Sequence, residues 1–280
     1  MLDRVRHASA VRRVRRVLRD KAVRVVEEVV SPYFRRQAQQ IDELRGEVAV
    51  LRAEVGHAAD RVVDHTDGIE FRRRRDMVVA GDTEAVRESA AFVRDHMASA
   101  RRFESPHATL EYGLSLAPAG GLALEFGVYS GATLKIIAAA REDQRVYGFD
   151  SFQGLPETWR ADYPAGTFAV PAPPEVPGAE LVVGWFADTL PGFLARHREP
   201  VDFLHVDADL YSAAATVLDA VGPRLREGSV IVFDEYFNYP GWQRHEHLAW
   251  QEYAGRTGTE FGYEAYTHNH EQVVVRVSGR

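Results

Sequence analysis

The amino-acid sequence predicts an α/β fold in which helices cover a mostly parallel sheet, preceded by a helical region. From residue 122 onward, short apolar runs alternate with stretches of helical periodicity, which is typical of βαβ units. The apolar runs are brief and nearly continuous, as expected of strands buried on both faces. Before residue 120, apolar residues recur at helical spacing instead.

The expected strands share an apolar interior and a length of four to seven residues: 122–127, 145–150, 181–184, 201–207 and 229–235. Helices are expected between and after them, near 131–141, 188–197, 212–224 and 243–254. Two further strands, 261–269 and 272–277, have no helix between them. That break in the alternation predicts an antiparallel hairpin at one edge of the sheet.

Periodicity divides the chain into three regions. Residues 1–60 form a helical, coiled-coil-like extension, residues 61–120 a helical linker or cap, and residues 121–280 the α/β domain. In the extension, apolar residues alternate at spacings of three and four, the pattern of a coiled-coil seam: Ile41, Leu44, Val48, Leu51 and Val55. The alternative is a helix packed on its own domain. We expect a homo-oligomer such as a dimer.

Ser31–Pro32 is expected to separate this helix from a basic helix before it, since proline is tolerated in the first turn of a helix and not in its interior. Residues 1–26 hold nine Arg or Lys and two Asp, a local charge of +7 within a chain of net charge −7. Apolar residues lie among these arginines: Val11, Val14, Val17 and Leu18. The segment predicts peripheral contact with an anionic membrane, or else a solvated arm.

Charge and composition exclude several classes. The chain outside the basic segment is acidic, so a nucleic-acid-binding role is not expected. No apolar run is long enough to span a bilayer, and arginines interrupt the N-terminal apolar stretches, unlike a secretory signal. A cytoplasmic location is the expectation. The chain has no cysteine, so a metal would be bound by oxygen or imidazole ligands.

The first strand runs into a turn with the pattern E-x-G-x-x-x-G, formed by Glu125, Gly127 and Gly131. Gly127 lets the backbone approach a ligand, and Gly131 opens a helix whose amides can bind a carboxylate. In a site for S-adenosylmethionine (SAM), that carboxylate is the methionine end, and Glu125 accepts from the amino group. The alternative is an ordinary strand–turn–helix junction. The spacing is not the G-x-G-x-x-G of dinucleotide sites.

Asp150 ends the next strand, where a carboxylate can accept from both ribose hydroxyls. Its alternative role is a turn or N-cap before Ser151. After the third strand, Trp185 and Phe186 could flank an adenine ring. The candidate cofactor-binding residues are Glu125, Phe126, Gly127, Tyr129, Ser130, Thr133, Asp150, Ser151, Phe152, Trp185, Phe186 and Asp207.

Three carboxylates follow the adjacent strands four and five: Asp207, Asp234 and Glu235. Because parallel strands end at the same edge, these side chains are expected to meet there and to repel one another. A hard divalent cation such as Mg²⁺ would relieve that repulsion. The alternative is that Asp209 and Asp234 cap helices and that Glu235 faces solvent.

Together, the segments E-x-G-x-x-x-G, VYGFDSFQGLPE, GWFADTLP, DFLHVDADLYSA and VIVFDEYFNYPGW resemble class I SAM-dependent methyltransferases. They are most similar to the macrocin O-methyltransferase group, which methylates sugar hydroxyls of macrolides and related glycosides. The resemblance covers residues 122–277 and implies a Rossmann-like, seven-stranded sheet with a reversed last strand. It implies SAM contacts for Glu125, Gly127 and Asp150, and Mg²⁺ ligation by Asp207, Asp234 and Glu235.

The expected function is Mg²⁺-dependent methylation of a hydroxyl on a sugar, a glycosylated natural product or a polysaccharide. Catechol-type relatives carry a lysine base three positions after the first metal aspartate, where this sequence has Leu210. The candidate catalytic bases are therefore Asp207 and, as second choice, His245; His268 and His270 are further candidates, although histidines near a strand end are more often ordinary surface residues. The segment 154–180 is expected to be a lid, with Trp159, Tyr163 and Phe168 stacking on a small-molecule or oligosaccharide acceptor.

Three alternatives stay open at this stage. A catechol-like phenolic acceptor would fit the same domain, although the missing lysine disfavours it. A dinucleotide-dependent oxidoreductase is disfavoured by the missing glycine pattern. A non-catalytic protein organised by its N-terminal helices would bind partners through residues 1–60.

Overall fold

The computed structural model describes residues 2–141 and 145–279, with side chains from residue 12 onward. The chain divides into two compact units, Met1–Arg75 and Asp76–Arg280. Val11, which the sequence places in the basic segment, lies outside the described side chains. Each unit is described by itself.

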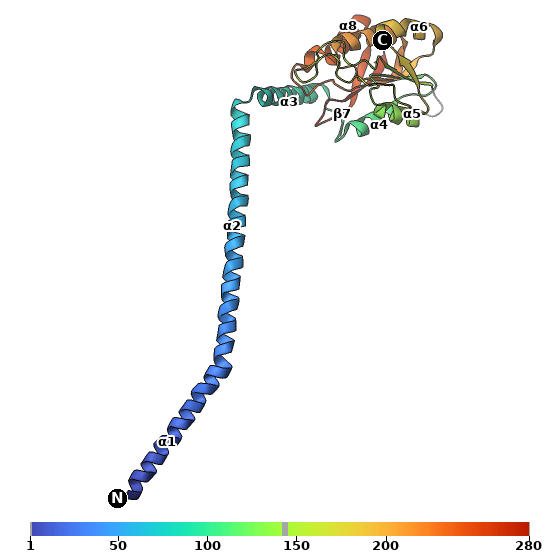
Figure 1. The fold of residues 1–280 in the computed structure, drawn as a ribbon. Coiled ribbons are helices and arrows are strands. Elements are labelled where there is room, and N and C mark those ends of the chain that lie inside the picture. Colours follow the sequence, from blue (N-terminus) through green and yellow to red (C-terminus); the bar gives the residue numbers. More distant parts are fainter. Residues whose placement is uncertain (1, 142–144, 280) are drawn as a thin grey trace. The chain divides into compact units, whose positions relative to one another are not determined.

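The first unit is helical from Leu2 to Arg75. It consists of α1 (Leu2–Val25), a π-helical turn η1 (Val26–Val30) and α2 (Ser31–Arg75), with no non-helical residue between them (Figure 1). Pro32 lies in the first turn of α2. Because proline has no amide to donate to the preceding turn, the wider π-turn before it accommodates the missing bond. The predicted separation at Ser31–Pro32 is thus a change of helix type.

The boundary predicted near residue 60 falls inside α2, which continues to Arg75. Helical periodicity does not change at residue 60, so the structure has no element boundary there. The functional division of residues 1–120 into an extension and a cap stays a prediction, as does membrane contact by the basic N-terminus. Among the described residues, no helix combines the length and the apolar character needed to cross a membrane.

The second unit alternates strands and helices as predicted (Figure 1). Its strands are β1 (Arg101–Phe103), β2 (Leu122–Phe126), β3 (Arg145–Asp150), β4 (Glu180–Val183), β5 (Val201–Val206), β6 (Leu225–Phe233), β7 (Glu260–Thr267) and β8 (Val273–Gly279). Its helices are α3 (Met77–His96), α4 (Pro106–Leu116), α5 (Ala132–Ala140), α6 (Phe186–Arg196), α7 (Tyr211–Val221) and α8 (Glu246–Thr257), with short 3₁₀ turns η2 (Gly222–Arg224) and η3 (Trp242–Arg244).

Within the described residues these strands form one eight-stranded sheet in the order β1-β7-β8-β6-β5-β2-β3-β4. All neighbours pair in parallel except β8, which is antiparallel to both β6 and β7. The predicted Rossmann-like sheet with a reversed last strand is confirmed. The predicted number of seven strands was one too few, because β1 pairs with the outer side of β7. With three residues, two of them arginine, β1 has no apolar strand pattern to recognise.

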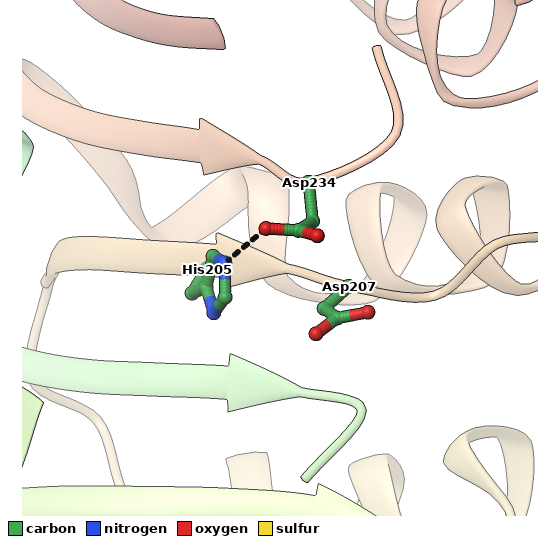
Figure 2. A group of neighbouring side chains, drawn as sticks. All are labelled: His205, Asp207 and Asp234. Carbon is green, nitrogen blue, oxygen red and sulfur yellow. Dashed lines mark ion pairs between the residues drawn. The ribbon is translucent and has the colours of Figure 1, made fainter. Parts of the chain in front are cut away.

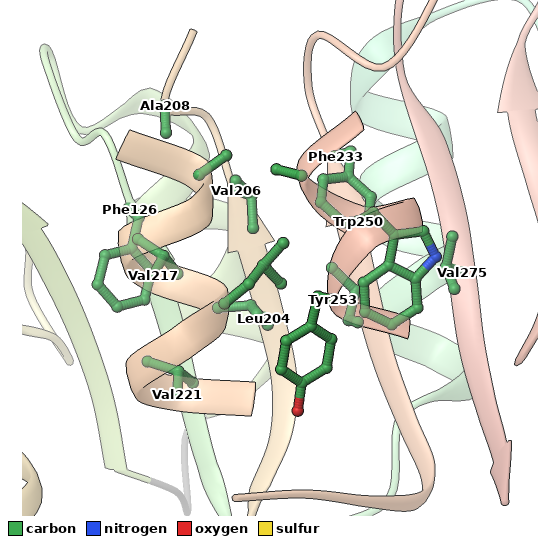
Figure 3. Packing of buried hydrophobic residues seen from close by; sticks show 14 of the residues in the cluster. Phe126, Leu204, Val206, Ala208, Val217, Val221, Phe233, Trp250, Tyr253 and Val275 are labelled. Atoms are coloured by element: carbon green, nitrogen blue, oxygen red, sulfur yellow. The ribbon is translucent and has the colours of Figure 1, made fainter. Parts of the chain in front are cut away.

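The sheet is buried on both faces, with α6, α7 and α8 covering one face and α4 and α5 the other (Figure 1). Successive residues of β2 alternate between them: Leu124 and Phe126 pack with α7, and Ala123 packs with α4 and α5. Figure 3 shows the first layer, where Trp250 and Tyr253 of α8 pack beside Val217 and Val221 of α7. The two apolar layers hold the carboxyl ends of the strands in register.

Helix α3 packs against the rest of the second unit through an aromatic cluster. Its N-cap is Asp76, whose Oδ1 accepts from the amide of Val78 at 2.9 Å. The Phe92 ring packs edge-on against His247 at 5.1 Å and Trp242 at 5.4 Å between ring centroids. The imidazole of His247 is thereby surrounded by rings, including that of Tyr236 at 4.9 Å.

Burial, followed by the nearby His96, lowers the pKa of His247 from 6.5 to about 4. Protonation is therefore easier in the unfolded chain. We expect the free energy of unfolding to be undiminished by this group above pH 6.5, and to fall by up to about 3 kcal/mol as the pH drops toward 4. His247→Phe keeps the ring contacts and removes the titration, so its free energy of unfolding should fall less over this range.

Urea unfolding of the wild type and of His247→Phe at pH 7 and pH 4.5 measures this difference. The control is His107→Phe, which alters an exposed histidine on α4. An identical pH dependence of the wild type and His247→Phe would contradict the prediction.

Candidate active site

The carboxyl ends of the central strands meet at one edge of the sheet, and a cavity lies there. Its volume is about 390 Å³, within the range of small-molecule sites. Residues that follow β2, β3, β4, β5 and β6 line it, together with parts of the β3–β4 segment and the β7–β8 turn. This edge is where parallel α/β sheets bind ligands.

Gly127 lets two strand ends approach each other closely. Its φ is +96°, and a Cβ there would lie 1.8 Å from the carbonyl oxygen of Asp207. A side chain would therefore be strained and would also collide with backbone. The sequence predicts this close approach for a ligand; in the structure the backbone of Asp207 makes it. Gly131, with φ +74°, is the N-cap of α5, so it opens that helix as predicted.

Asp150 fixes the loop after β2. Its Oδ2 accepts from the amides of Val128 and Tyr129 at 2.9 and 2.8 Å, and its Oδ1 accepts from the amide of Phe152 at 2.7 Å. One side chain thus joins two loops that line the cavity. A carboxylate offers about four acceptor sites, so Asp150 retains capacity for a further donor.

His205 lies between two carboxylates on neighbouring strands. Its Nδ1 is 2.8 Å from Glu125 Oε1, and its Nε2 is 3.6 Å from Asp234 Oδ1. Figure 2 shows the ring directed at Asp234, with Asp207 on the segment after the same strand. Burial alone would lower the pKa of His205, but the two carboxylates outweigh burial and hold that pKa well above its usual value.

The same contacts act on the carboxylates. Burial raises the pKa of Glu125, and hydrogen bonds with His205 and Thr133 offset only part of that rise. Burial also opposes the charged form of Asp234, but the contact with His205 prevails and lowers the pKa of Asp234. A positive His205 beside a negative Asp234 is therefore the favoured arrangement.

Acidic side chains gather beyond the ends of β5 and β6. Carboxylate oxygens of Asp207, Asp209 and Glu235 lie within 4.8 Å of one another. Possible ligand atoms of His205, Asp207 and Asp234 form a second group within the same distance. Burial raises the pKa of Asp207 and Glu235 well above their usual values, and neighbouring carboxylates add to the rise. Burial also raises the pKa of Asp209 to about 7. This cluster stores repulsion that a cation would relieve.

Glu246, at the start of α8, joins the two acidic strand ends. Its Oε1 accepts from the amide of Ala208 at 3.2 Å, and its Oε2 accepts from the amide of Glu235 at 3.0 Å. The side chain is fully buried. Because both oxygens bond to backbone, Glu246 fixes the segments that carry Asp207 and Glu235.

Aromatic side chains of the β3–β4 segment line the cavity, as the lid prediction expects for Trp159, Tyr163 and Phe168. The rings of Tyr163 and Phe168 stack at 5.7 Å, and Phe168 meets Tyr129 edge-on at 5.6 Å between ring centroids. The segment is held by backbone hydrogen bonds, among them Leu155 N to Thr167 O at 2.9 Å.

Arg160 ties this segment to the β7–β8 turn. Its guanidinium lies 3.7 Å from the ring centre of Trp159 and 3.6 Å from that of Tyr239. The same group pairs with both carboxylate oxygens of Glu271, with Nη1 at 3.1 Å from Oε1. Arg160 and Glu271 both line the cavity. A bidentate pair between two aromatic rings gives the wall of the cavity a fixed shape.

Comparisons with known proteins agree with this geometry. Residues 124–236 match the family described as a methyltransferase domain. The second unit thus contains the segment that matches a methyltransferase domain. A relative from Streptomyces olivaceus, named 8-demethyl-8-(2,3-dimethoxy-alpha-L-rhamnosyl)-tetracenomycin-C 4'-O-methyltransferase, is 28% identical over 138 residues, covering 40% of this chain and 52% of that protein. The chain thus spans about half the length of this relative.

Among solved structures, the calicheamicin methyltransferase CalS11 is 25% identical, with a TM-score of 0.51 and coverage of 61% of this chain and 76% of that chain. The resemblance to methyltransferases of this type, predicted from the sequence motifs, is confirmed.

The structure brings seven of the candidate cofactor-binding residues to the cavity of the methyltransferase domain: Gly127, Tyr129, Asp150, Ser151, Trp185, Phe186 and Asp207. The other five are not among the described residues that line it: Glu125, Phe126, Ser130, Thr133 and Phe152. Glu125 bonds with His205 instead, Phe126 stacks on Phe149 at 4.5 Å, and Phe152 is buried in the core. Their roles toward a cofactor stay predictions.

Of the candidate metal ligands, Asp207 and Glu235 lie in one group and Asp207 and Asp234 in another. Of the candidate bases, Asp207 and His270 line the cavity, and His245 and His268 are not among the described residues that line it. His245 sits at the N-cap position of α8, with its ring 5.9 Å from that of Tyr239. Burial, followed by the charge of Arg160, lowers the pKa of His245.

Sequence reasoning missed His205, Glu246 and Arg160. His205 stands two positions before Asp207, so both side chains point to the same face of the strand, and this spacing could have identified it. Glu246 and Arg160 act through partners far away in the sequence, and no local pattern indicates them.

We expect Gly127→Ala to destabilise the methyltransferase domain by at least about 2 kcal/mol more than Gly120→Ala. Gly120 has a similar φ, +103°, but a Cβ there would meet nothing within 4 Å. The control therefore carries the backbone strain without the collision. Urea unfolding of the two variants measures the difference, and equal destabilisation would show that the approach to Asp207 is not tight.

Proposed function

We propose that this chain is a SAM-dependent O-methyltransferase that acts on a hydroxyl of a sugar in a glycosylated small molecule. The observation that carries the proposal is the cavity, where a wall built around Gly127 and Asp150 meets the acidic cluster at Asp207. The names of the relatives support the reaction, since the Streptomyces olivaceus protein is a 4'-O-methyltransferase of a rhamnosyl compound.

The cofactor fits the side of the cavity that follows β2, β3 and β4. Asp150 would accept from a ribose hydroxyl with its remaining capacity, and Trp185 and Phe186 would lie against the adenine. The amides at the start of α5 would bind the carboxylate of the methionine end. SAM supplies a methyl group that is already activated on its sulfonium. The protein therefore has to align the acceptor and manage one proton.

The acidic cluster fits a divalent cation. The buried Oε2 of Glu235 has no hydrogen-bond partner, and carboxylate oxygens are the donors that Mg²⁺ prefers. Asp207, Asp209, Asp234 and Glu235 are the candidate ligands on the described geometry. A cation bound there would supply positive charge that lowers the pKa of an acceptor hydroxyl.

The protein's own side chains would hold the acceptor and accept its proton. Trp159, Tyr163 and Phe168 line the cavity and would hold a sugar acceptor while excluding water. No lysine is found among the described residues that line the cavity, and Leu210 is there instead. Asp207 is our candidate to accept the proton, since it lines the cavity beside the acidic cluster, whereas His245 is not among the described residues that line it.

The test is methyl transfer from labelled SAM to three acceptors: a rhamnosylated polyketide, the same compound without its sugar, and a catechol. We expect transfer to the glycoside with Mg²⁺ and loss of transfer with EDTA. Asp207→Asn should lower kcat by at least about 100-fold, because it removes one candidate ligand and the candidate base. The control is Asp188→Asn, an exposed aspartate in the first turn of α6.

Several results would contradict the proposal. Transfer to the catechol alone would show that the acceptor is a phenol and not a sugar. Full activity in EDTA would show that the reaction requires no divalent cation. If calorimetry detected binding of NADH and no binding of SAM, the proposed methyltransferase reaction would be wrong.

A further inference from the structure

Helix α2 carries an apolar seam that nothing within its own unit covers. The seven apolar side chains of the seam are between 45% and 67% exposed: Ile41, Leu44, Val48, Leu51, Val55, Val62 and Ile69. None of the described residues of α2 is buried. Long helices in water owe most of their stability to packing of an apolar face. The seam therefore needs an occupant.

The helix is also poorly stabilised on its own. Gly46, Gly56 and Gly68 lie in its interior, and a Cβ at any of them would meet nothing within 4 Å. Glycine in a helix interior costs about 1 kcal/mol relative to alanine. Because these glycines stand off the seam, packing along the seam can compensate for them.

The seam has the composition of a two-stranded coiled coil. With Ile41 as heptad position a, every a position up to residue 69 is β-branched: Ile41, Val48, Val55, Val62 and Ile69. The first two d positions are Leu44 and Leu51, followed by Ala58 and His65. β-Branched residues at a with leucine at d favour two parallel strands. The N-terminal half of the seam is the more apolar.

Charges beside the seam specify the orientation. Arg45 and Arg52 occupy e positions, and Glu47 and Glu54 occupy g positions. In a parallel pair, position g of one helix faces position e of the next heptad in the other, so Glu47 meets Arg52 of a second copy. In an antiparallel pair, e faces e and g faces g, which sets arginine against arginine and glutamate against glutamate.

We infer that residues 41–69 form a parallel, two-stranded coiled coil with a second copy of this chain. The two chains run in the same direction, so both methyltransferase domains follow the same end of the coiled coil. Both basic N-terminal segments precede the other end, which doubles the local charge of +7 there. The inference does not depend on the proposed reaction, because it uses residues of the first unit alone.

Sedimentation equilibrium of the full chain tests the assembly. We expect twice the chain mass of 31.4 kDa. The double variant Val48→Asp/Val55→Asp places charges at two a positions and should raise the dissociation constant by at least about 100-fold. The matched control, Val50→Asp/Val63→Asp, changes two valines that are 59% and 56% exposed and stand off the seam. It should remain dimeric.

Charge exchange tests the orientation. Arg52→Glu should weaken a parallel dimer, and Glu47→Arg/Arg52→Glu should restore it; in an antiparallel pair, Arg52→Glu alone would strengthen the dimer. The absence of native cysteine allows a second measurement. Leu44→Cys should form a disulfide-linked dimer on oxidation, and Val50→Cys should not.

A monomeric wild type would overturn the inference and would mean that the seam packs on its own chain. A trimer, or equal effects of the two aspartate pairs, would also overturn it. Methyl transfer by each variant is measured alongside. Loss of dimer with retained transfer separates a failure of the coiled coil from a failure of the proposed reaction.

Discussion

Electrostatic repulsion among the buried and half-buried carboxylates that follow β5 and β6 is the constraint on which the arrangement of the rest of the second unit depends. Acidic residues directly follow two adjacent parallel strands, so their charges meet at the same edge of the sheet. Burial disfavours the charged forms and neighbouring carboxylates add to this effect, so the pKa values of Asp207 and Glu235 lie well above their usual values. Such an arrangement costs stability, and the cation that we propose would offset this cost.

The surrounding structure holds the repelling groups in place. Apolar layers on both faces keep β5 and β6 in register, and Glu246 bonds to the backbone of both strand ends. His205 compensates Asp234 from the inner side. Strain is also stored here, since Tyr129 and Asp209 have φ values of +46° and +58°. Non-glycine residues adopt such angles mainly where surrounding contacts enforce them.

Much of this could be predicted from the sequence, because the information is local. A strand that ends in Asp207 and another that ends in Asp234-Glu235 place three carboxylates at one edge once the sheet is taken as parallel. The element order and the reversed β8 follow from apolar runs with and without helices between them. The seam of α2 is likewise visible as a spacing of apolar residues.

The missing parts depend on contacts across the chain. Strand register sets Glu125 opposite His205, whose Nδ1 lies 2.8 Å from Glu125 Oε1, and no local pattern indicates this contact; the predicted role of Glu125 toward a cofactor stays a prediction. Phe152 likewise packs in the core through contacts that its local sequence does not indicate. The strand β1 went unseen because its pairing with β7 depends on tertiary structure and not on its own three residues.

The most direct test of the account is the thermal stability of Glu235→Gln with and without Mg²⁺. In the absence of a cation, this variant removes repulsion and should melt about 2–4 °C above the wild type. Mg²⁺ should raise the melting temperature of the wild type and leave that of Glu235→Gln unchanged. The control Glu175→Gln, at an exposed position, should behave like the wild type. A variant that melts lower without the cation and still responds to Mg²⁺ would contradict the central claim.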